Sequence, residues 1–198
     1  MSSDEVNKGR RRFLVATTTV VGGIGVGIAA IPFIQSWMPS AKAKAVGAPV
    51  EVNISKLKEG QLLKVQWRGQ TIGILYRTPE MIADLSKVDD ALVDPTSAEA
   101  EQPAYIHGEA RALRPELLIV NMHCTHLGCV PQMIPEVGPQ PFDENWQGGF
   151  YCPCHKSKFD LSGRVYKGVP APTNLRIPPY SFLDDRTVLL GINPQGAV

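Results

Sequence analysis

The residues best suited to chemistry are concentrated in two short segments of the chain. Residues 123–129 read HCTHLGC and residues 152–155 read CPCH, so together they hold all four cysteines and three of the four histidines. Thiolates and imidazoles bind soft and borderline metal ions, and paired thiols can also form disulfides. The pattern therefore indicates a zinc ion, a disulfide staple or an iron–sulfur cluster.

A zinc site and a purely disulfide site each leave part of the pattern unexplained. Zinc sites usually take two close cysteines from one segment and two histidines from another, whereas each segment here mixes the two residue types. A zinc site would also leave one cysteine over in each segment. Two disulfides would use every cysteine but would assign nothing to the neighbouring histidines.

An iron–sulfur cluster with two thiolates on one iron and two imidazoles on the other uses the whole pattern. Two thiolates and two imidazoles are available for it: Cys124, Cys152, His126 and His155. Cys129 and Cys154 are then free to join the two segments by a disulfide, which requires an oxidising compartment. His123, directly before the first of these cysteines, and His107, in a polar stretch, are expected not to be ligands.

Short strands are predicted to carry these segments. Strand-like patterns occur at residues 49–54, 61–67, 70–77, 115–122, 148–152, 163–168 and 186–192. Thr78 and Pro79 predict the start of one short helix over residues 78–88. Residues 89–114 and 130–151 are polar and are expected to be surface excursions. The many prolines and glycines among short strands predict a mainly β, antiparallel domain with long functional loops.

The N-terminal part of the chain predicts a membrane segment. Residues 13–37 carry no charge, and about 20 apolar residues suffice to cross a bilayer. Residues 1–12 contain consecutive arginines that resemble a twin-arginine export signal, or that only fix orientation by the positive-inside rule. We expect a cytoplasmic N-terminus, a single retained anchor at 13–37, a flexible linker at 38–48 and a periplasmic domain at 49–198.

Two motifs carry a family resemblance. CTHLGC (124–129) and CPCHKS (152–157) resemble the paired signature of Rieske iron–sulfur proteins, and GVPAP (168–172) resembles the loop that covers the cluster in that family. With the arginine-led anchor, the chain most resembles Rieske subunits of bacterial cytochrome bc complexes. The resemblance implies one Rieske-type [2Fe–2S] cluster in an antiparallel β-sandwich domain, with a cluster-binding subdomain at about 119–175.

The resemblance also implies a mechanism and partners. His155 would hydrogen-bond ubiquinol and accept its proton while the cluster accepts an electron, and the second electron would pass to cytochrome b. The domain would then swing on its linker to a c-type cytochrome, contributing to proton translocation. Ser157 matches the serine whose hydroxyl bonds a bridging sulfide. The implied assembly is a homodimeric complex in the bacterial inner membrane.

Two positions depart from the family pattern. Many members have a tyrosine where this chain has Phe159, which predicts a lower midpoint potential. The family usually has glycine where this chain has Lys156. Its charge could join a basic group with Lys158, Arg164 and Lys167, or the residue could alter the loop backbone or its docking; both interpretations stay open.

Two other functions are compatible with parts of the sequence. A low-potential Rieske ferredoxin of an oxygenase system would use the same ligands, but such ferredoxins generally lack the extra cysteine pair and the anchor. A non-redox structural metalloprotein would need the cluster to be absent. The net charge of +1 argues against a nucleic-acid binder, whose footprint is a strongly basic face, so no nucleic-acid partner is expected.

Overall fold

The computed structural model describes residues 7–99 and 101–194 of the 198-residue chain. It divides into two compact units, Met1–Ala45 and Val46–Val198. The first six residues of the predicted cytoplasmic segment and the last four of the predicted domain lie outside the described residues.

The first unit is built around helix α1 (Lys8–Ser36), which includes all of the predicted anchor except Trp37. Asn7 caps its start, because the Asn7 Oδ1 atom accepts a hydrogen bond from the Arg10 amide at 3.0 Å. The most apolar stretch of α1 has a mean hydropathy of 2.0. By length and composition, α1 can therefore cross a membrane.

The predicted flexible linker contains a short helix, α2 (Ala41–Val46). The Ser40 hydroxyl accepts a hydrogen bond from the Ala43 amide at 3.1 Å and so caps the helix start. Alanine and lysine are strong helix formers, which explains why this Ala-Lys repeat is helical rather than irregular.

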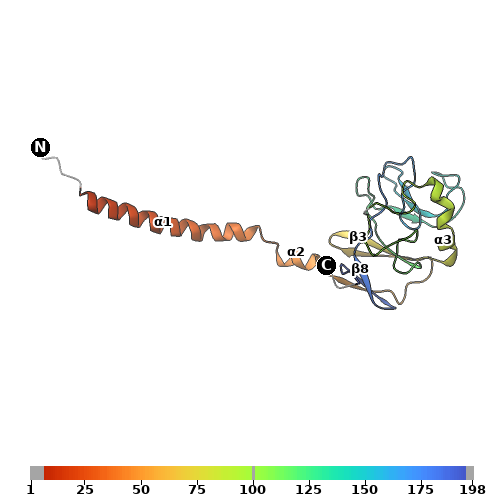
Figure 1. Cartoon of the computed structure of the whole chain (residues 1–198), viewed down its shortest axis with the longest axis horizontal. Coiled ribbons are helices and arrows are strands. Elements are labelled where there is room, and N and C mark those ends of the chain that lie inside the picture. Colours follow the sequence, from red (N-terminus) through yellow and green to blue (C-terminus); the bar gives the residue numbers. More distant parts are fainter. Residues whose placement is uncertain (1–6, 100, 195–198) are drawn as a thin grey trace. The chain divides into compact units, whose positions relative to one another are not determined.

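Within the described residues, the second unit consists of three antiparallel sheets of three strands each. Figure 1 labels β3 and β8, which belong to two of these sheets. The first sheet has the order β1 (Val50–Asn53), β9 (Thr187–Leu190), β8 (Tyr180–Asp184). The second has the order β2 (Leu62–Trp67), β3 (Gln70–Tyr76), β4 (Leu117–Asn121). The third has the order β5 (Gln132–Ile134), β6 (Gly149–Tyr151), β7 (Lys158–Phe159). The prediction of a mainly β, antiparallel fold is confirmed.

The predicted hairpin and the predicted buried strand are both present. β2 and β3 pair from Trp67 opposite Gln70, and the two turn residues Arg68 and Gly69 have φ of 50° and 72°. Positive φ at both positions is what a tight two-residue hairpin turn requires. β3 also pairs with β4, whose five residues are all buried. This buried strand leads directly to the first Cys/His segment.

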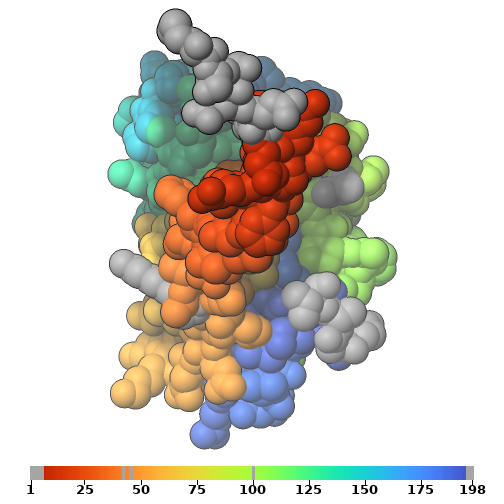
Figure 2. Space-filling view, turned by 90° about the vertical axis from the view of Figure 1, so that its left-hand side faces the viewer, coloured from red at the N-terminus to blue at the C-terminus, as the bar shows by residue number. Residues whose placement is uncertain are grey.

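The larger hydrophobic core contains residues of all three sheets and of the Cys/His segments. It contains Val188 of β9, Ile74 of β3 and Phe150 of β6, together with Cys124 and Cys152. Figures 1 and 2 show that segments around residues 120–160 lie at one end of the domain, while β1, β8 and β9 lie at the other. The core therefore fixes the Cys/His segments at one end of the domain.

The predicted short helix exists but is shorter than expected. Helix α3 (Pro79–Ala83) begins after Thr78, whose hydroxyl accepts a hydrogen bond from the Met81 amide. The chain then tightens into the 3₁₀ helix η1 (Leu85–Ala91). The strand predicted at 163–168 is wrong: this segment makes only isolated bridges.

Both predicted surface excursions are more buried than expected. Residues 89–114 bury Leu92, Ile106 and Arg111 almost completely. Residues 130–151 include β5 and the fully buried Trp146, which is part of a second, smaller hydrophobic core. The sequence analysis did not predict this burial because both stretches are mostly polar. A few large buried side chains are nevertheless enough to dock a long loop.

Candidate metal centre

The two Cys/His segments form loops with the same backbone hydrogen bonds. In each loop, the leading cysteine amide donates to the carbonyl five residues later, and its own carbonyl accepts from the amide four residues later. These bonds measure 2.8 and 2.8 Å in residues 124–129, and 2.8 and 2.9 Å in residues 152–157. The first loop follows β4 and the second follows β6, so sheet strands position both.

The fifth residue of each loop needs a left-handed backbone. Gly128 has φ of 82° in the first loop, and Lys156 has φ of 64° at the equivalent position of the second. Glycine adopts this region freely, whereas a residue with a Cβ pays about 1–2 kcal/mol. The loop geometry therefore explains why a glycine is expected at 156, and the backbone accommodates lysine there at a cost.

The structure brings the four predicted ligands to the two neighbouring loops. Cys124 and Cys152 are free thiols that are 3% and 2% exposed. The rings of His126 and His155 meet edge to face, with their centroids 4.8 Å apart. His126 is half-buried and His155 is exposed. Cys124 neighbours Cys152, and the His126 ring neighbours the His155 ring. This pairing fits a cluster that has thiolates on one iron and imidazoles on the other.

The environment of Cys124 favours the protonated thiol when no metal is bound. Burial raises the pKa of the Cys124 thiol, and the nearby Cys152 thiol raises it further. Hydrogen bonds from the His126 backbone and the Ser157 side chain lower this pKa in part. Metal binding requires the thiolate, so a bound cation would displace this proton.

The predicted disulfide is present. Cys129 and Cys154 are joined, which links the end of the first loop to the middle of the second. Their Sγ atoms and the Sγ atom of Cys152 lie within 4.8 Å of one another. Because two of these three sulfurs form the disulfide, only Cys152 of this trio offers a thiol to a metal.

A third loop is tied to both Cys/His loops. Ser157 is fully buried, and its hydroxyl accepts a hydrogen bond from the Ala171 amide at 3.1 Å. The Thr125 hydroxyl donates to the Thr173 carbonyl at 2.7 Å. The GVPAP segment at 168–172 therefore packs beside the site, as the resemblance implied. The sequence analysis did not single out Thr125. Its position between the predicted ligands Cys124 and His126 could have indicated a role in the site.

Arg164, one of the residues of the predicted basic group, is fully buried. Its Nε atom donates to Asp160 Oδ2 at 2.8 Å, and its Nη1 atom pairs with Asp89 Oδ1 at 2.8 Å. Its Nη2 atom donates to the Leu85 carbonyl at 2.7 Å. Asp160 lies just beyond the second loop, so this network attaches the segment around η1 to the base of the site.

Two further buried arginines reinforce this attachment, and sequence reasoning missed both. Arg77 donates to Ser162 Oγ at 2.7 Å, and Arg111 donates to the Leu175 carbonyl at 2.7 Å. Burial lowers the pKa of each guanidinium to about 10, and the nearby Asp160 carboxylate partly offsets this effect. Both remain cations at neutral pH and hold the excursion at 89–114 against the site.

An aromatic group packs the 130–151 segment beside the second loop. The rings of Phe142 and Tyr151 stack at 3.9 Å, and Phe142 meets Trp146 edge to face at 5.2 Å. Trp146 in turn stacks on Tyr166 at 5.9 Å. Since Tyr151 immediately precedes the predicted ligand Cys152, this segment supports the site rather than standing apart from it.

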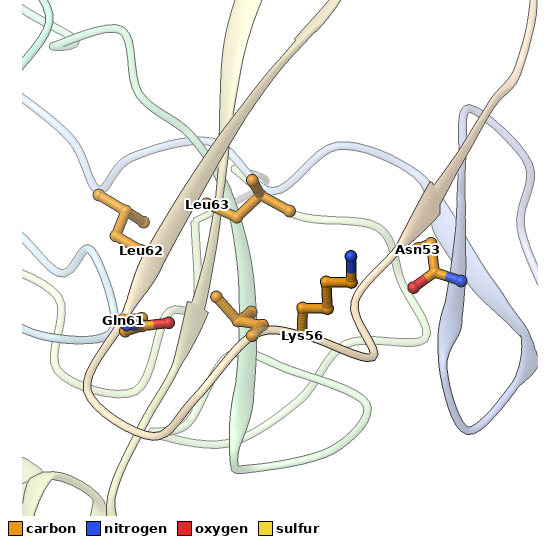
Figure 3. Close-up of a pocket in the computed structure, with 6 residues that line it drawn as sticks. Asn53, Lys56, Gln61, Leu62 and Leu63 are labelled. Atoms are coloured by element: carbon orange, nitrogen blue, oxygen red, sulfur yellow. The ribbon is translucent and has the colours of Figure 1, made fainter.

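A separate surface hollow lies away from this chemistry. It has a volume of about 420 Å³ and lies in the region where the chain passes from β1 to β2. Figure 3 shows its labelled side chains: Asn53, Lys56, Gln61, Leu62 and Leu63. None of its lining residues is a cysteine or histidine, so we assign it no part in the site.

Comparison with known proteins finds matches over most of the chain. Residues 1–40 match the family described as "Ubiquitinol-cytochrome C reductase Fe-S subunit TAT signal". Residues 49–180 match the Rieske [2Fe-2S] domain. A solved structure of a hyperthermophilic respiratory Complex III aligns with a TM-score of 0.47 and 24% identity, covering 89% of this chain and 98% of that one.

Known relatives are similar in sequence to this chain over nearly its full length. The ubiquinol-cytochrome c reductase iron-sulfur subunit of Allochromatium vinosum is 54% identical, over 96% of this chain and 92% of the relative. The subunit of the same name from Blastochloris viridis is 42% identical, over 96% and 97%. The chain therefore belongs to the family of Rieske iron–sulfur subunits of ubiquinol–cytochrome c reductase.

Proposed function

We propose that this protein takes one electron from ubiquinol and passes it to a c-type cytochrome within a cytochrome bc complex. Its family membership makes it a subunit of an oxidoreductase complex that carries a Rieske [2Fe–2S] cluster. The observation that carries the proposal is that the two loops hold a pair of imidazoles, with ring centroids 4.8 Å apart, and two buried free thiols.

Four residues are proposed as the iron ligands: Cys124, Cys152, His126 and His155. When bound, the cluster supplies a one-electron acceptor, and Rieske centres have potentials of roughly −150 to +300 mV. The Ser157 hydroxyl, fully buried beside Cys124, is proposed to donate to a cluster sulfur and so raise the potential. The disulfide and the third loop hold the two ligand loops together around it.

His155 is proposed as the catalytic residue because it is the exposed imidazole of the pair. An exposed ring nitrogen can accept a hydrogen bond from a quinol hydroxyl and then take its proton. A quinol that loses an electron becomes a much stronger acid, so the proton and the electron leave together at low cost. The more buried His126 is less accessible to substrate and is assigned only a ligand role.

We further propose the cellular arrangement and the partners. Residues 1–12 lie in the cytoplasm, 13–37 span the inner membrane, 38–48 connect, and 49–198 form the periplasmic domain. The match of residues 1–40 to an export signal and the presence of a disulfide both support an exported domain. Cytochrome b and a c-type cytochrome are the proposed partners in a homodimeric complex, which contributes to proton translocation. The cluster-binding subdomain is proposed at about 119–175.

The function is tested by following ubiquinol-driven reduction of a c-type cytochrome in membranes that contain this chain. We expect rapid reduction that depends on the chain being present. Membranes that assemble the chain with its cluster but reduce no cytochrome would contradict the proposal. The alternative of an oxygenase ferredoxin is not favoured, because the relatives above are all subunits of ubiquinol–cytochrome c reductase.

Replacing Phe159 by tyrosine is expected to raise the midpoint potential. Phe159 is fully buried in the same hydrophobic cluster as the proposed ligands Cys124 and Cys152. A buried tyrosine hydroxyl needs a hydrogen-bond acceptor, and we propose a ligand sulfur for that role. One hydrogen bond of about 1 kcal/mol corresponds to roughly 40 mV for one electron. Redox titration of the cluster signal measures this shift, and an unchanged or lower potential would contradict it.

A further inference from the structure

Lys156 differs in its contacts from the other residues of the predicted basic group, which are Lys158, Arg164 and Lys167. Lys158 pairs with Asp143 and Arg164 pairs with Asp160, whereas the exposed Lys167 donates a hydrogen bond to the Asp90 carbonyl. Lys156 is exposed, and among residues 7–99 and 101–194 no carboxylate lies within ion-pair distance of its ammonium group. Its charge is therefore available to another molecule.

The backbone at Lys156 does not favour a lysine. The equivalent position in the first loop is Gly128, and both residues have positive φ, 82° for the glycine and 64° for the lysine. A side chain with a Cβ is disfavoured in this conformation. The lysine thus occupies a position that suits glycine, and within the described domain its side chain gains no ion pair or hydrogen bond in return.

The charge of Lys156 lies next to the exposed histidine of the site. It directly follows the exposed His155, and the first loop presents Leu127, which is 70% exposed. Any electron donor or acceptor that approaches the outer imidazoles meets this surface. A quinol is uncharged, and burying an ammonium group in an apolar quinol site would carry a large desolvation cost. Electron-transfer contacts between proteins are small, hydrated and steered by charge.

We propose that Lys156 is a specificity-determining residue that recognises a carboxylate on the electron-accepting c-type cytochrome. The ammonium group pairs with that carboxylate when the exposed His155 side of the site faces the acceptor. The contact guides the domain into the acceptor position and contributes little at the quinol site. This inference rests on the proposed function, because it concerns the second of the two encounters proposed there.

The test uses the intact complex and a single turnover. After a pulse of ubiquinol, reduction of the complex's own c-type cytochrome is followed at about 20 mM and about 300 mM salt, without added soluble cytochrome. We expect Lys156→Gln to slow reduction about three- to tenfold at low salt and to abolish most of the salt dependence. Lys156→Arg, which keeps the charge, is expected to stay close to wild type.

Two further variants separate charge from backbone and from general charge loss. Lys156→Gly removes the charge and relieves the backbone, so it should be as slow as Lys156→Gln although better suited to the loop. Lys64→Gln removes the same charge from an exposed position on β2 and should behave as wild type. The Michaelis constant for quinol should be unchanged in all four variants.

Specific results would overturn the inference. Lys156→Gln with the rate and salt dependence of wild type would do so, and so would a fast Lys156→Gly. A slowdown explained by a lower midpoint potential, or seen as weaker quinol binding, would assign Lys156 to potential tuning or to the quinol site instead. A wild-type complex with an intact cluster that reduces no cytochrome would refute the proposed function itself, a distinct result.

Discussion

Replacing Cys152 by serine is expected to abolish the iron–sulfur cluster and with it all quinol oxidation. The Cys152 thiol is 2% exposed. Cys124 is itself a proposed ligand, and Cys129 and Cys154 form the disulfide, so no other cysteine is free to replace it. A serine hydroxyl is a much harder and less acidic ligand than a thiol. Electron paramagnetic resonance of the purified complex should show no cluster signal, and turnover should fall to background.

A matched control tests the ligand assignment at the histidines. His155→Ala should lose the cluster like Cys152→Ser, whereas His123→Ala should keep both the signal and turnover. His123 directly precedes Cys124, and its amide donates to Asn121 Oδ1 at 3.0 Å, which fixes its backbone. A cluster signal that survives His155→Ala, or that disappears in His123→Ala, would refute the proposed ligand set.

Replacing Asp160 by alanine is expected to lower the free energy of unfolding by about 3–5 kcal/mol. Asp160 is 2% exposed, and it accepts hydrogen bonds from the Arg164 guanidinium and from two backbone amides. Its removal leaves a fully buried guanidinium paired only with the partly exposed Asp89. For a domain of this size the melting temperature should fall by roughly 6–20 °C, measured by circular dichroism of the full chain.

An exposed ion pair provides the control for this stability prediction. Arg114 pairs with Asp185 at 3.0 Å, and the carboxylate side chain is 92% exposed. Asp185→Ala should cost no more than about 1 kcal/mol, because such pairs are screened by solvent. Equal melting temperatures for the Asp160 and Asp185 variants would show that the buried network does not stabilise the domain.

The sequence predicts local features of this fold well. The hairpin at Arg68-Gly69, the cap at Thr78 and the buried strand β4 each depend on neighbouring residues, and the structure contains all three. The Cys/His segments were also recognisable, because their chemistry is set by residue type and close spacing. The pairing of Cys129 with Cys154 followed from the same pattern.

What the sequence could not show depends on contacts between distant segments. Arg164 was grouped with other basic residues, and its burial depends on pairing with Asp160 and with Asp89, 75 residues earlier. Trp146 lies in a polar stretch, yet its indole donates to the Ile134 carbonyl and packs on Tyr166. These contacts follow no periodic sequence pattern, so only the folded structure shows them.

The measurement that tests the central claim most directly is electron paramagnetic resonance of membranes containing this chain, reduced first with ascorbate and then with dithionite. A quinol-oxidising cluster has a high potential, so we predict a Rieske signal of low average g already with ascorbate. A signal that arises only with dithionite would contradict the proposed quinol oxidation and indicate a low-potential carrier. The absence of any cluster signal in zinc-containing protein would refute the ligand assignment as well.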